Sequence, residues 1–317
     1  MLNPAVSQMI AQNDKRVVIT GAGGWLGLAT LDLLAGALGD AAQSRIVCIG
    51  SSARTLTLCN GQTFEQLALA DLGTLPAEPT WLLHYAFLTK DRAETMDEAE
   101  YTAANRAISR FVVESLDSIG TEAVFLASSG AAYRADDDGA SAAMRLYGAL
   151  KAEEEQRFAD WAKARNRSAV IARLFNLSGP YINKHQAYAL AQFILDAQAG
   201  GPVEVCAPKR VYRSFVSIPE LISLAFALLG QSASGVTRFD SGGEVLELGE
   251  VAERVNRVLV GGGVNRAALT QAGEDRYAGN GSTYAALLAK HAITPVSLDD
   301  QIAETAHYLA HQQGALA

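Results

Sequence analysis

Short apolar runs alternate with longer segments of helical periodicity over the first half of the chain. The runs are rich in β-branched residues and lie at 15–20, 45–50, 81–85, 123–127 and 168–175. Between them, apolar residues recur at helical spacing, as at Leu28, Leu31 and Leu34, and the periodicity returns over 103–118 and 147–163. Such runs are typical of strands buried on both faces, and strands that alternate with helices form a parallel sheet with right-handed crossovers. The pattern predicts an α/β fold with a doubly wound parallel sheet.

The alternation becomes less regular beyond about residue 176. Residues 176–186 have the composition of a loop, 186–200 have helical periodicity, and later segments alternate irregularly. We therefore expect a smaller, interleaved lobe in the C-terminal part of the chain.

Composition narrows the class of protein. Hydrophobic residues make up 49% and charged residues 19%, which is rich enough for a large core. The net charge of −8 and the scattered basic residues disfavour nucleic-acid binding. The three cysteines, Cys48, Cys59 and Cys206, are too widely spaced for a disulfide framework or a metal site. No signal peptide and no apolar run near the ~20 residues of a membrane span stand out. We expect a cytoplasmic protein without metal, membrane or nucleic-acid partners.

Glycines lie three apart between the first expected strand and the first expected helix. They are Gly21, Gly24 and Gly27, and the usual dinucleotide pattern G-x-G-x-x-G is not met, because Leu26 stands where its last glycine would be. Glycine still permits the tight turn and lets backbone N–H groups approach a pyrophosphate at the positive end of the helix. The turn predicts a Rossmann-type cofactor site, with Trp25 and Leu26 contributing from the helix start. The alternative is a glycine turn chosen only for packing.

The residues after the second expected strand bear on the choice of cofactor. An Asp or Glu there would bind a ribose 2′-hydroxyl, as NAD requires, but the chain has Ser51, Ser52 and Arg54 instead. These side chains suit a 2′-phosphate, so NADP is favoured over NAD. Asp71 and Leu72 are expected beside the adenine.

A serine, a tyrosine and a lysine follow the fourth expected strand. Tyr147 and Lys151 stand four apart and so share one face of a helix, and Ser129 lies at the strand end. A free tyrosine has a pKa near ~10, and a nearby lysine cation lowers it, so that the phenol can exchange a proton near neutral pH. The alternative is an exposed helix face with no chemical role.

These motifs, in this order, resemble the extended short-chain dehydrogenase/reductases, and among them the NAD-dependent epimerase/dehydratase branch that acts on nucleotide sugars. The resemblance runs over nearly the whole chain. It implies that Ser129, Tyr147 and Lys151 are catalytic, with Lys151 also binding the cofactor ribose. Further cofactor-binding residues that the resemblance implies are Tyr85, Ala86, Asn105, Tyr147, Leu174 and Asn176. The substrate-binding residues that it implies are Ser129, Asn176, Arg213 and Arg276, the two arginines on a substrate phosphate.

Some positions depart from the pattern of that family. Gly130 and Ala131 stand where a 4,6-dehydratase would carry an Asp-Glu pair, which disfavours dehydration. The loop 134–145 is short and lacks the usual glutamate and proline, and Pro219-Glu220 stand where an Asp is expected. The loop bears on the substrate, because it walls the sugar site in that family.

The resemblance implies the domain layout and the activity. We expect a lead-in at 1–14, a dinucleotide-binding Rossmann domain at 15–176, and a mainly substrate-binding lobe at 177–317 with about 211–230 returning to the Rossmann domain. The predicted activity is NAD(P)-dependent oxidoreduction or epimerisation of a nucleotide-activated sugar. The alternatives are an NADP-dependent reductase of a smaller carbonyl compound and a non-catalytic dinucleotide-binding regulatory protein. The resemblance also implies a homodimer, which a mass measurement at micromolar concentration would test.

Overall fold

A computed structural model describes residues 1–231 and 233–314, with side chains described through residue 312 apart from 232. The chain forms two compact units. Unit 1 contains Met1–Leu174 and Ile222–Asp240, and unit 2 contains Phe175–Leu221 and the chain from Ser241 onward. The segment that packs with unit 1 after the first crossing is therefore 222–240, whereas the sequence analysis placed a returning segment at about 211–230.

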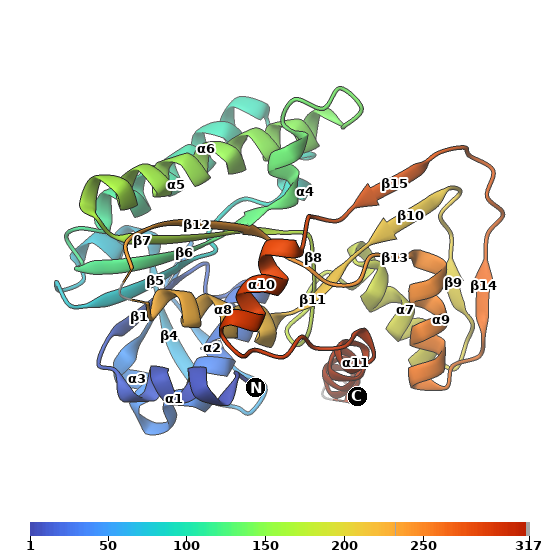
Figure 1. Cartoon of the computed structure of the whole chain (residues 1–317), viewed down its shortest axis with the longest axis horizontal. Coiled ribbons are helices and arrows are strands. Elements are labelled where there is room, and N and C mark those ends of the chain that lie inside the picture. Colours follow the sequence, from blue (N-terminus) through green and yellow to red (C-terminus); the bar gives the residue numbers. More distant parts are fainter. Residues whose placement is uncertain (232, 315–317) are drawn as a thin grey trace. The chain divides into compact units, whose positions relative to one another are not determined.

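Unit 1 is organised around one large sheet (Figure 1). Within the described residues this sheet has eight strands in the order β12-β7-β6-β5-β1-β2-β4-β3. The strands are β1 (Arg16–Thr20), β2 (Ile46–Gly50), β3 (Arg54–Thr57), β4 (Thr63–Ala68), β5 (Thr80–His84), β6 (Thr121–Ser129), β7 (Ser168–Leu174) and β12 (Gly235–Asp240). Neighbouring strands are parallel except in the β3–β4 hairpin. The predicted doubly wound parallel sheet is confirmed.

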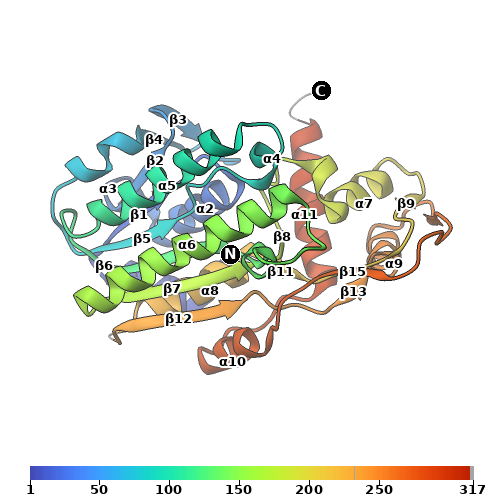
Figure 2. The same ribbon diagram turned by 90° about the horizontal axis from the view of Figure 1, so that it is seen from above.

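Helices cover both faces of this sheet (Figures 1 and 2). On one face α5 (Glu98–Ser115) and α6 (Ala142–Arg165) lie side by side, and on the other lie α1 (Pro4–Gln12), α2 (Trp25–Leu38) and α3 (Ala42–Arg45). The helix α8 (Ile218–Leu229) joins unit 1 from Ile222 onward. Short helical turns are η1 (Gly39–Ala41), η2 (Leu69–Thr74), α4 (Lys90–Ala93) and η3 (Gly130–Arg134).

The core between the sheet and the α5–α6 layer explains why the apolar runs are continuous. Leu82 and Val124 of the central strands are fully buried against Val112 of α5 and Phe158 of α6. Residues of opposite parity face the other side, where the Trp81 ring contacts the ring of Phe226 on α8 at 5.8 Å. Both faces of each central strand are thus removed from water, so polar residues do not alternate with apolar residues along these strands.

An ion pair fastens α6 to the sheet. The buried carboxylate of Glu155 accepts two hydrogen bonds of 2.8 Å from the Arg173 guanidinium on β7. It also accepts a hydrogen bond of 2.6 Å from the Ser128 hydroxyl on β6. A bidentate pair of this kind sets both the rotation and the height of the helix over the strands.

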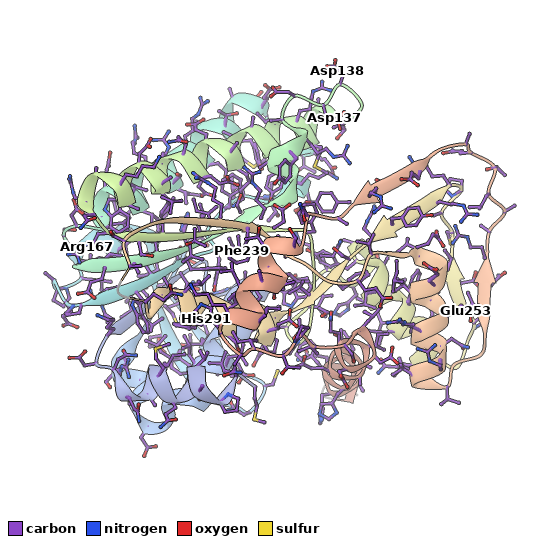
Figure 3. All side chains as sticks on the ribbon, in the orientation of Figure 1. Asp137, Asp138, Arg167, Phe239, Glu253 and His291 are labelled. Carbon is purple, nitrogen blue, oxygen red and sulfur yellow. The ribbon has the colours of Figure 1, made fainter. Side chains whose placement is uncertain are left out.

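Two helix starts differ from the sequence expectation. The N-terminal lead-in forms α1, because the Asn3 side chain caps it by accepting hydrogen bonds from Ala5 N and Val6 N. The helix α6 begins at Ala142 rather than near Tyr147, because Ser141 caps it. The acidic residues Asp137 and Asp138 lie on the loop that leads into α6, outside the helical layer (Figure 3).

The segment Trp25–Arg45 is long and apolar enough, by length and composition, to cross a membrane. This differs from the sequence expectation that no apolar run approaches that length. It lies between β1 and β2, and 56% of its most apolar window is buried inside the structure. Burial of this extent is typical of a helix in the core of an α/β domain.

Unit 2 is built from short strands and four longer helices, counted over the described residues. Its strands pair as β13-β10-β15, β11-β8 and β14-β9. They are β8 (Asn176–Ser178), β9 (Val203–Val205), β10 (Arg210–Arg213), β11 (Phe215–Ser217), β13 (Leu246–Glu247), β14 (Val264–Arg266) and β15 (Glu274–Tyr277). Its helices are η4 (His185–Ala187), α7 (Ala189–Gln198), α9 (Leu248–Leu259), α10 (Ser282–Lys290) and α11 (Leu298–Gly314). The helices α7, α9 and α11 pack on one another around the fully buried side chains of Ile194, Val255 and Ile302.

Candidate active site

The strand order of unit 1 reverses at the carboxyl ends of β1 and β5, which is where an open α/β sheet is expected to have its ligand crevice. The chain leaves β1 for a helix on one face of the sheet and leaves β5 for a helix on the other face. In open α/β sheets, ligands bind where the strand order reverses in this way. The last residues of the two strands, Thr20 and His84, are partners in register, so the segments that follow them line the same crevice.

The glycine turn after β1 has no room for side chains at two of its positions. Gly21 has φ of +74°, and a Cβ there would lie 2.8 Å from the backbone N of Ala86. A Cβ at Gly27 would lie 2.3 Å from the carbonyl oxygen of Gly21. The helix α2 follows with Gly24 as its N-cap and without a side-chain cap. The turn therefore forms a cradle lined by backbone at the positive end of a helix, and this fits the pyrophosphate of a dinucleotide.

The second edge of the cradle is formed by β2 and the β3–β4 hairpin. Arg54 lies across the glycine turn and donates a hydrogen bond of 3.3 Å to Gly23 O. The buried Gln66 donates to Ser52 O at 2.7 Å, which fixes the orientation of its amide. The Oε1 atom of Gln66 has no hydrogen-bond partner among the described residues. Ser51 and Ser52 are exposed beside them.

The structure brings Ser129, Tyr147 and Lys151 together at the end of β6 and on the facing turn of α6. Ser129 makes a side-chain hydrogen bond to Tyr147. Burial, opposed by that bond and reinforced by the Glu154 carboxylate, raises the pKa of Tyr147 to about 12. The Tyr147 ring meets the Phe87 ring edge-on, with centroids 5.7 Å apart.

Lys151 is buried and has a defined set of partners. Its ammonium donates to Ala127 O at 3.0 Å and to Glu154 Oε2 at 2.9 Å. It also lies 3.9 Å from the centroid of the Phe87 ring. The Glu154 carboxylate in turn contacts His84 Nε2 at 3.0 Å.

The remaining predicted residues of unit 1 differ in what their side chains contact. The Asn105 amide is bonded to the backbone of Leu88, which fixes the segment after β5. Leu72 is fully buried in the core, and Asp71 is exposed and accepts a hydrogen bond from Ala68 N. The Tyr85 hydroxyl lies 3.2 Å from the Thr30 hydroxyl, and Ala86 lies against the glycine turn. Trp25 and Leu26 are in the first turn of α2, and Leu174 is the last residue of β7.

Three predicted residues belong to unit 2. Asn176 donates hydrogen bonds to Ser214 O at 3.0 Å and to Tyr277 O at 3.4 Å. Arg213 pairs with the Asp275 carboxylate at 2.8 Å and stands opposite Tyr277 in the β10–β15 ladder. Arg276 is half exposed, with its guanidinium 4.9 Å from the centroid of the Tyr212 ring. The structure thus places Asn176 and Arg213 next to Tyr277, the last residue of β15.

Sequence reasoning missed several residues of these clusters. Glu154, Gln66 and His84 were not among the predicted site residues. Helical spacing could have pointed to Glu154, because it stands three residues after Lys151 and so shares its helix face. Among the described residues, no group of three or more His, Cys, Asp or Glu side chains could hold a metal ion.

The sheet order, the crevice at its reversal point and the backbone-lined glycine cradle define a Rossmann-type dinucleotide-binding protein. The model of the NAD dependent epimerase/dehydratase family matches residues 17–248, which is most of the chain. The chain belongs to this family and is an enzyme. The predicted resemblance to that branch of the extended short-chain dehydrogenase/reductases is confirmed.

Solved structures with the same fold include several enzymes of this kind. A UDP-N-acetylglucosamine 4-epimerase from Methanobrevibacter ruminantium M1, in complex with UDP-N-acetylmuramic acid, is 18% identical with a TM-score of 0.73, over 95% of this chain and 100% of that one. A dTDP-glucose 4,6-dehydratase from Streptomyces venezuelae, with NAD bound, is 19% identical with a TM-score of 0.69, over 95% and 98% of the two chains. A UDP-glucuronic acid 4-epimerase from Bacillus cereus, in complex with UDP-glucuronic acid and NAD, is 16% identical with a TM-score of 0.69, over 94% and 99%. At these identities the likeness shows the fold. The comparison with curated proteins found no match.

Proposed function

We propose that this enzyme oxidises or reduces a carbon–oxygen centre of a nucleotide-activated sugar, as an epimerase or oxidoreductase that uses NAD or NADP. The observation that carries the proposal is the cluster of Ser129, Tyr147 and Lys151 beside the carboxyl ends of the strands of a dinucleotide-binding sheet. Ser129 is hydrogen-bonded to Tyr147, and the Tyr147 ring and the Lys151 ammonium both contact the Phe87 ring. The solved structures of the same fold support the substrate class, because they are named as enzymes of UDP- and dTDP-sugars.

Each side chain of the cluster has a separate part in the proposed mechanism. Tyr147 exchanges a proton with the substrate oxygen, and the Ser129 hydroxyl donates a hydrogen bond to that oxygen. Among the described residues, the Lys151 ammonium donates hydrogen bonds to Ala127 and Glu154. An ammonium has three N–H donors, so the third can bind a cofactor ribose. When the dinucleotide is bound along Gly21, Gly24 and Gly27, its nicotinamide supplies or receives the hydride.

The protonation of Tyr147 has a consequence for the direction of proton transfer. Burial raises the pKa of Tyr147 to about 12, so the side chain is a neutral phenol near pH 7 and is ready to donate a proton. To accept a proton it must first be deprotonated, and that state becomes more populated as pH rises or as positive charge is brought nearby. Gly130 and Ala131 follow Ser129 without a carboxyl group, so we propose epimerisation or redox chemistry rather than 4,6-dehydration.

The proposed phosphate ligands are Arg213 and Arg276 of unit 2. Arg213 stands opposite Tyr277 in the β10–β15 ladder and Arg276 stands opposite Tyr212, so the two side chains leave opposite faces of this ladder. Each arginine is therefore proposed to contact the substrate separately. Arg213 is paired with Asp275, and we propose that a substrate phosphate competes with this carboxylate for the guanidinium.

A substrate panel tests the function. Purified protein is incubated with NAD or NADP and with UDP- and dTDP-hexoses, UDP-hexuronic acids and small ketones, and products are separated by stereochemistry. We expect a change at one stereocentre or carbonyl of a nucleotide sugar. Turnover confined to the small ketones would favour the alternative reductase. Cofactor binding without turnover of any panel member would favour the regulatory protein.

Arg54 is the residue on which the proposed preference for NADP depends. Its guanidinium already lies over the glycine turn, where a 2′-phosphate of the adenosine ribose would supply an anion. A hydrogen bond to a charged group contributes about 1.5–3 kcal/mol, so Arg54→Ala should weaken NADP binding by about tenfold or more and NAD binding far less. Titration of both cofactors by fluorescence or calorimetry measures this.

Arg167 provides the matched control for that titration. It is an exposed arginine just before the amino end of β7 (Figure 3), whereas the glycine turn follows the carboxyl end of β1. Arg167→Ala should leave both affinities unchanged. Equal weakening of NAD and NADP by Arg54→Ala, or tighter binding of NAD by the unaltered protein, would refute the proposed preference.

A further inference from the structure

A chain of buried polar contacts runs from the end of β1 to the lysine of the catalytic cluster. The Thr20 hydroxyl lies 2.6 Å from His84 Nδ1, and His84 Nε2 lies 3.0 Å from Glu154 Oε1. The other oxygen of the same carboxylate, Oε2, accepts a hydrogen bond of 2.9 Å from Lys151 Nζ. All four side chains are at least 95% buried. The chain therefore links the strand that leads into the glycine turn to the helix that carries Tyr147.

His84 holds its end of this chain in a fixed position. The residue stands in register with Thr20 at the point where the strand order reverses. Its ring stacks on Phe158 of α6 with centroids 5.0 Å apart. A ring that is bonded at both nitrogens and stacked on one face has little freedom to turn, so it fixes the position of the Glu154 carboxylate.

Glu154 carries a negative charge in this setting. Burial alone would raise its pKa, but Lys151 and His84 outweigh the burial, and the pKa of Glu154 lies below the usual range. A carboxylate 2.9 Å from an ammonium inside a protein offsets most of the field that the ammonium exerts on its neighbours. Lys151 is the cation that the sequence analysis assigns to Tyr147, and the Glu154 carboxylate itself also raises the pKa of Tyr147.

Several charged and titratable groups face Tyr147 and Glu154 from the surrounding elements. Two anions raise the pKa of Tyr147, Glu154 on α6 and Asp91 on α4, and a hydrogen bond from Ser129 on β6 lowers it. The other groups around the pair are Lys151 on α6, His84 on β5, and Tyr101, Asn105 and Arg106 on α5 together with Arg157 on α6. Glu154 is the anion in direct contact with Lys151.

We propose that Glu154 is a positioning residue for the Tyr147–Lys151 pair. Held by His84, its carboxylate fixes the Lys151 ammonium and offsets its charge, so that Tyr147 remains a proton donor until positive charge is added in the crevice. The consequence is that proton abstraction by Tyr147 is tied to the bound, oxidised form of the cofactor. The proposal rests on the proposed role of Tyr147 in proton transfer.

The phenol of Tyr147 can be titrated directly, without a substrate or a cofactor. Phenolate absorbance is read within milliseconds of a jump to high pH, before unfolding, and the titration of the same protein carrying Tyr147→Phe is subtracted. Removing a negative charge that opposes the phenolate lowers the pKa of a phenol. For Glu154→Gln we expect the midpoint to fall by about one pH unit, so that at about pH 11 the ionised fraction rises from about a tenth to about half.

The neighbouring glutamate on the same helix provides the matched control. Glu153 is one third exposed and pairs with Arg106 and Arg157 rather than with Lys151. Glu153→Gln should leave the Tyr147 midpoint unchanged. Glu154→Asp keeps the charge and withdraws it by one methylene, so a smaller shift in the same direction is expected, and it serves as the second variant if Glu154→Gln does not fold.

The outcomes separate this proposal from a merely structural ion pair and from the proposed function. A Glu154 variant that loses stability but keeps the Tyr147 midpoint, or raises it, overturns the proposal. A midpoint that falls, in a protein for which the substrate panel finds no turnover, supports the role of Glu154 and counts only against the proposed function. An unchanged midpoint with an active, Tyr147-dependent enzyme does the reverse.

Discussion

Replacing Tyr147 with phenylalanine is expected to lower kcat by about 10²–10⁴-fold on the substrate that the panel identifies, because general acid–base catalysis contributes about that much. The change removes one oxygen atom and keeps the ring, which meets Phe87 edge-on. The cofactor affinity should stay within about threefold, because the backbone-lined glycine cradle is untouched. Steady-state kinetics and cofactor titration on the same preparation measure both quantities.

Tyr308→Phe is the control for this experiment. Tyr308 lies on α11 of unit 2, and its ring contacts that of Tyr181 at 5.4 Å, a contact that phenylalanine keeps. The Tyr308→Phe enzyme should turn over the substrate at the rate of the unaltered enzyme. A Tyr147→Phe protein that keeps full activity would show that another group moves the proton, and one that loses cofactor binding as well as turnover would show that the residue supports the fold of the crevice.

The second large effect is expected from Glu155→Ala. This change leaves the Arg173 guanidinium without its bidentate partner and the Ser128 hydroxyl without its acceptor. Breaking a buried ion pair costs about 3–5 kcal/mol, and the lower end, about 3 kcal/mol, applies because a quarter of the Arg173 side chain reaches water. Chemical denaturation measures the loss in the free energy of unfolding.

Glu153→Ala is the matched comparison, because it removes the same side chain two positions earlier on α6. Glu153 forms ion pairs with Arg106 and Arg157 near the surface, and exposed pairs contribute about 0–1 kcal/mol. We expect its loss to change the free energy of unfolding by less than about 1 kcal/mol. Similar losses for Glu153→Ala and Glu155→Ala would show that the Arg173 pair does not fasten α6 to the sheet.

The strands were the part of the fold that could be predicted most closely. The run 81–85 corresponds to β5 at Thr80–His84, and 45–50 corresponds to β2 at Ile46–Gly50. A strand buried on both faces excludes polar side chains along its whole length, and this leaves a strong mark in the sequence. Helix α1 has a weaker signal in the sequence, because it depends on one cap at Asn3 and on the burial of only two side chains.

The different roles of the three consecutive glutamates of α6 could not be predicted from the sequence. Each helical residue is turned by about 100° from the one before it, so neighbours in the sequence face different surroundings. Glu153 faces surface arginines, Glu154 faces Lys151 and His84, and Glu155 faces Arg173. The sequence shows three equivalent carboxylates, and two of the partners that distinguish them, His84 and Arg173, lie on the strands β5 and β7.

The sequence by itself determined the parallel sheet, the glycine turn, and the placement of Tyr147 and Lys151 on one face of a helix. These follow from local rules, because burial, backbone freedom and helical spacing act between residues close together along the chain. Only the tertiary structure decided that His84, 70 positions before Glu154, fixes the carboxylate beside Lys151. That contact depends on the strand order, which puts β5 beside β1 and under α6. The charge that acts on Tyr147 is therefore a property of the assembled sheet and helix.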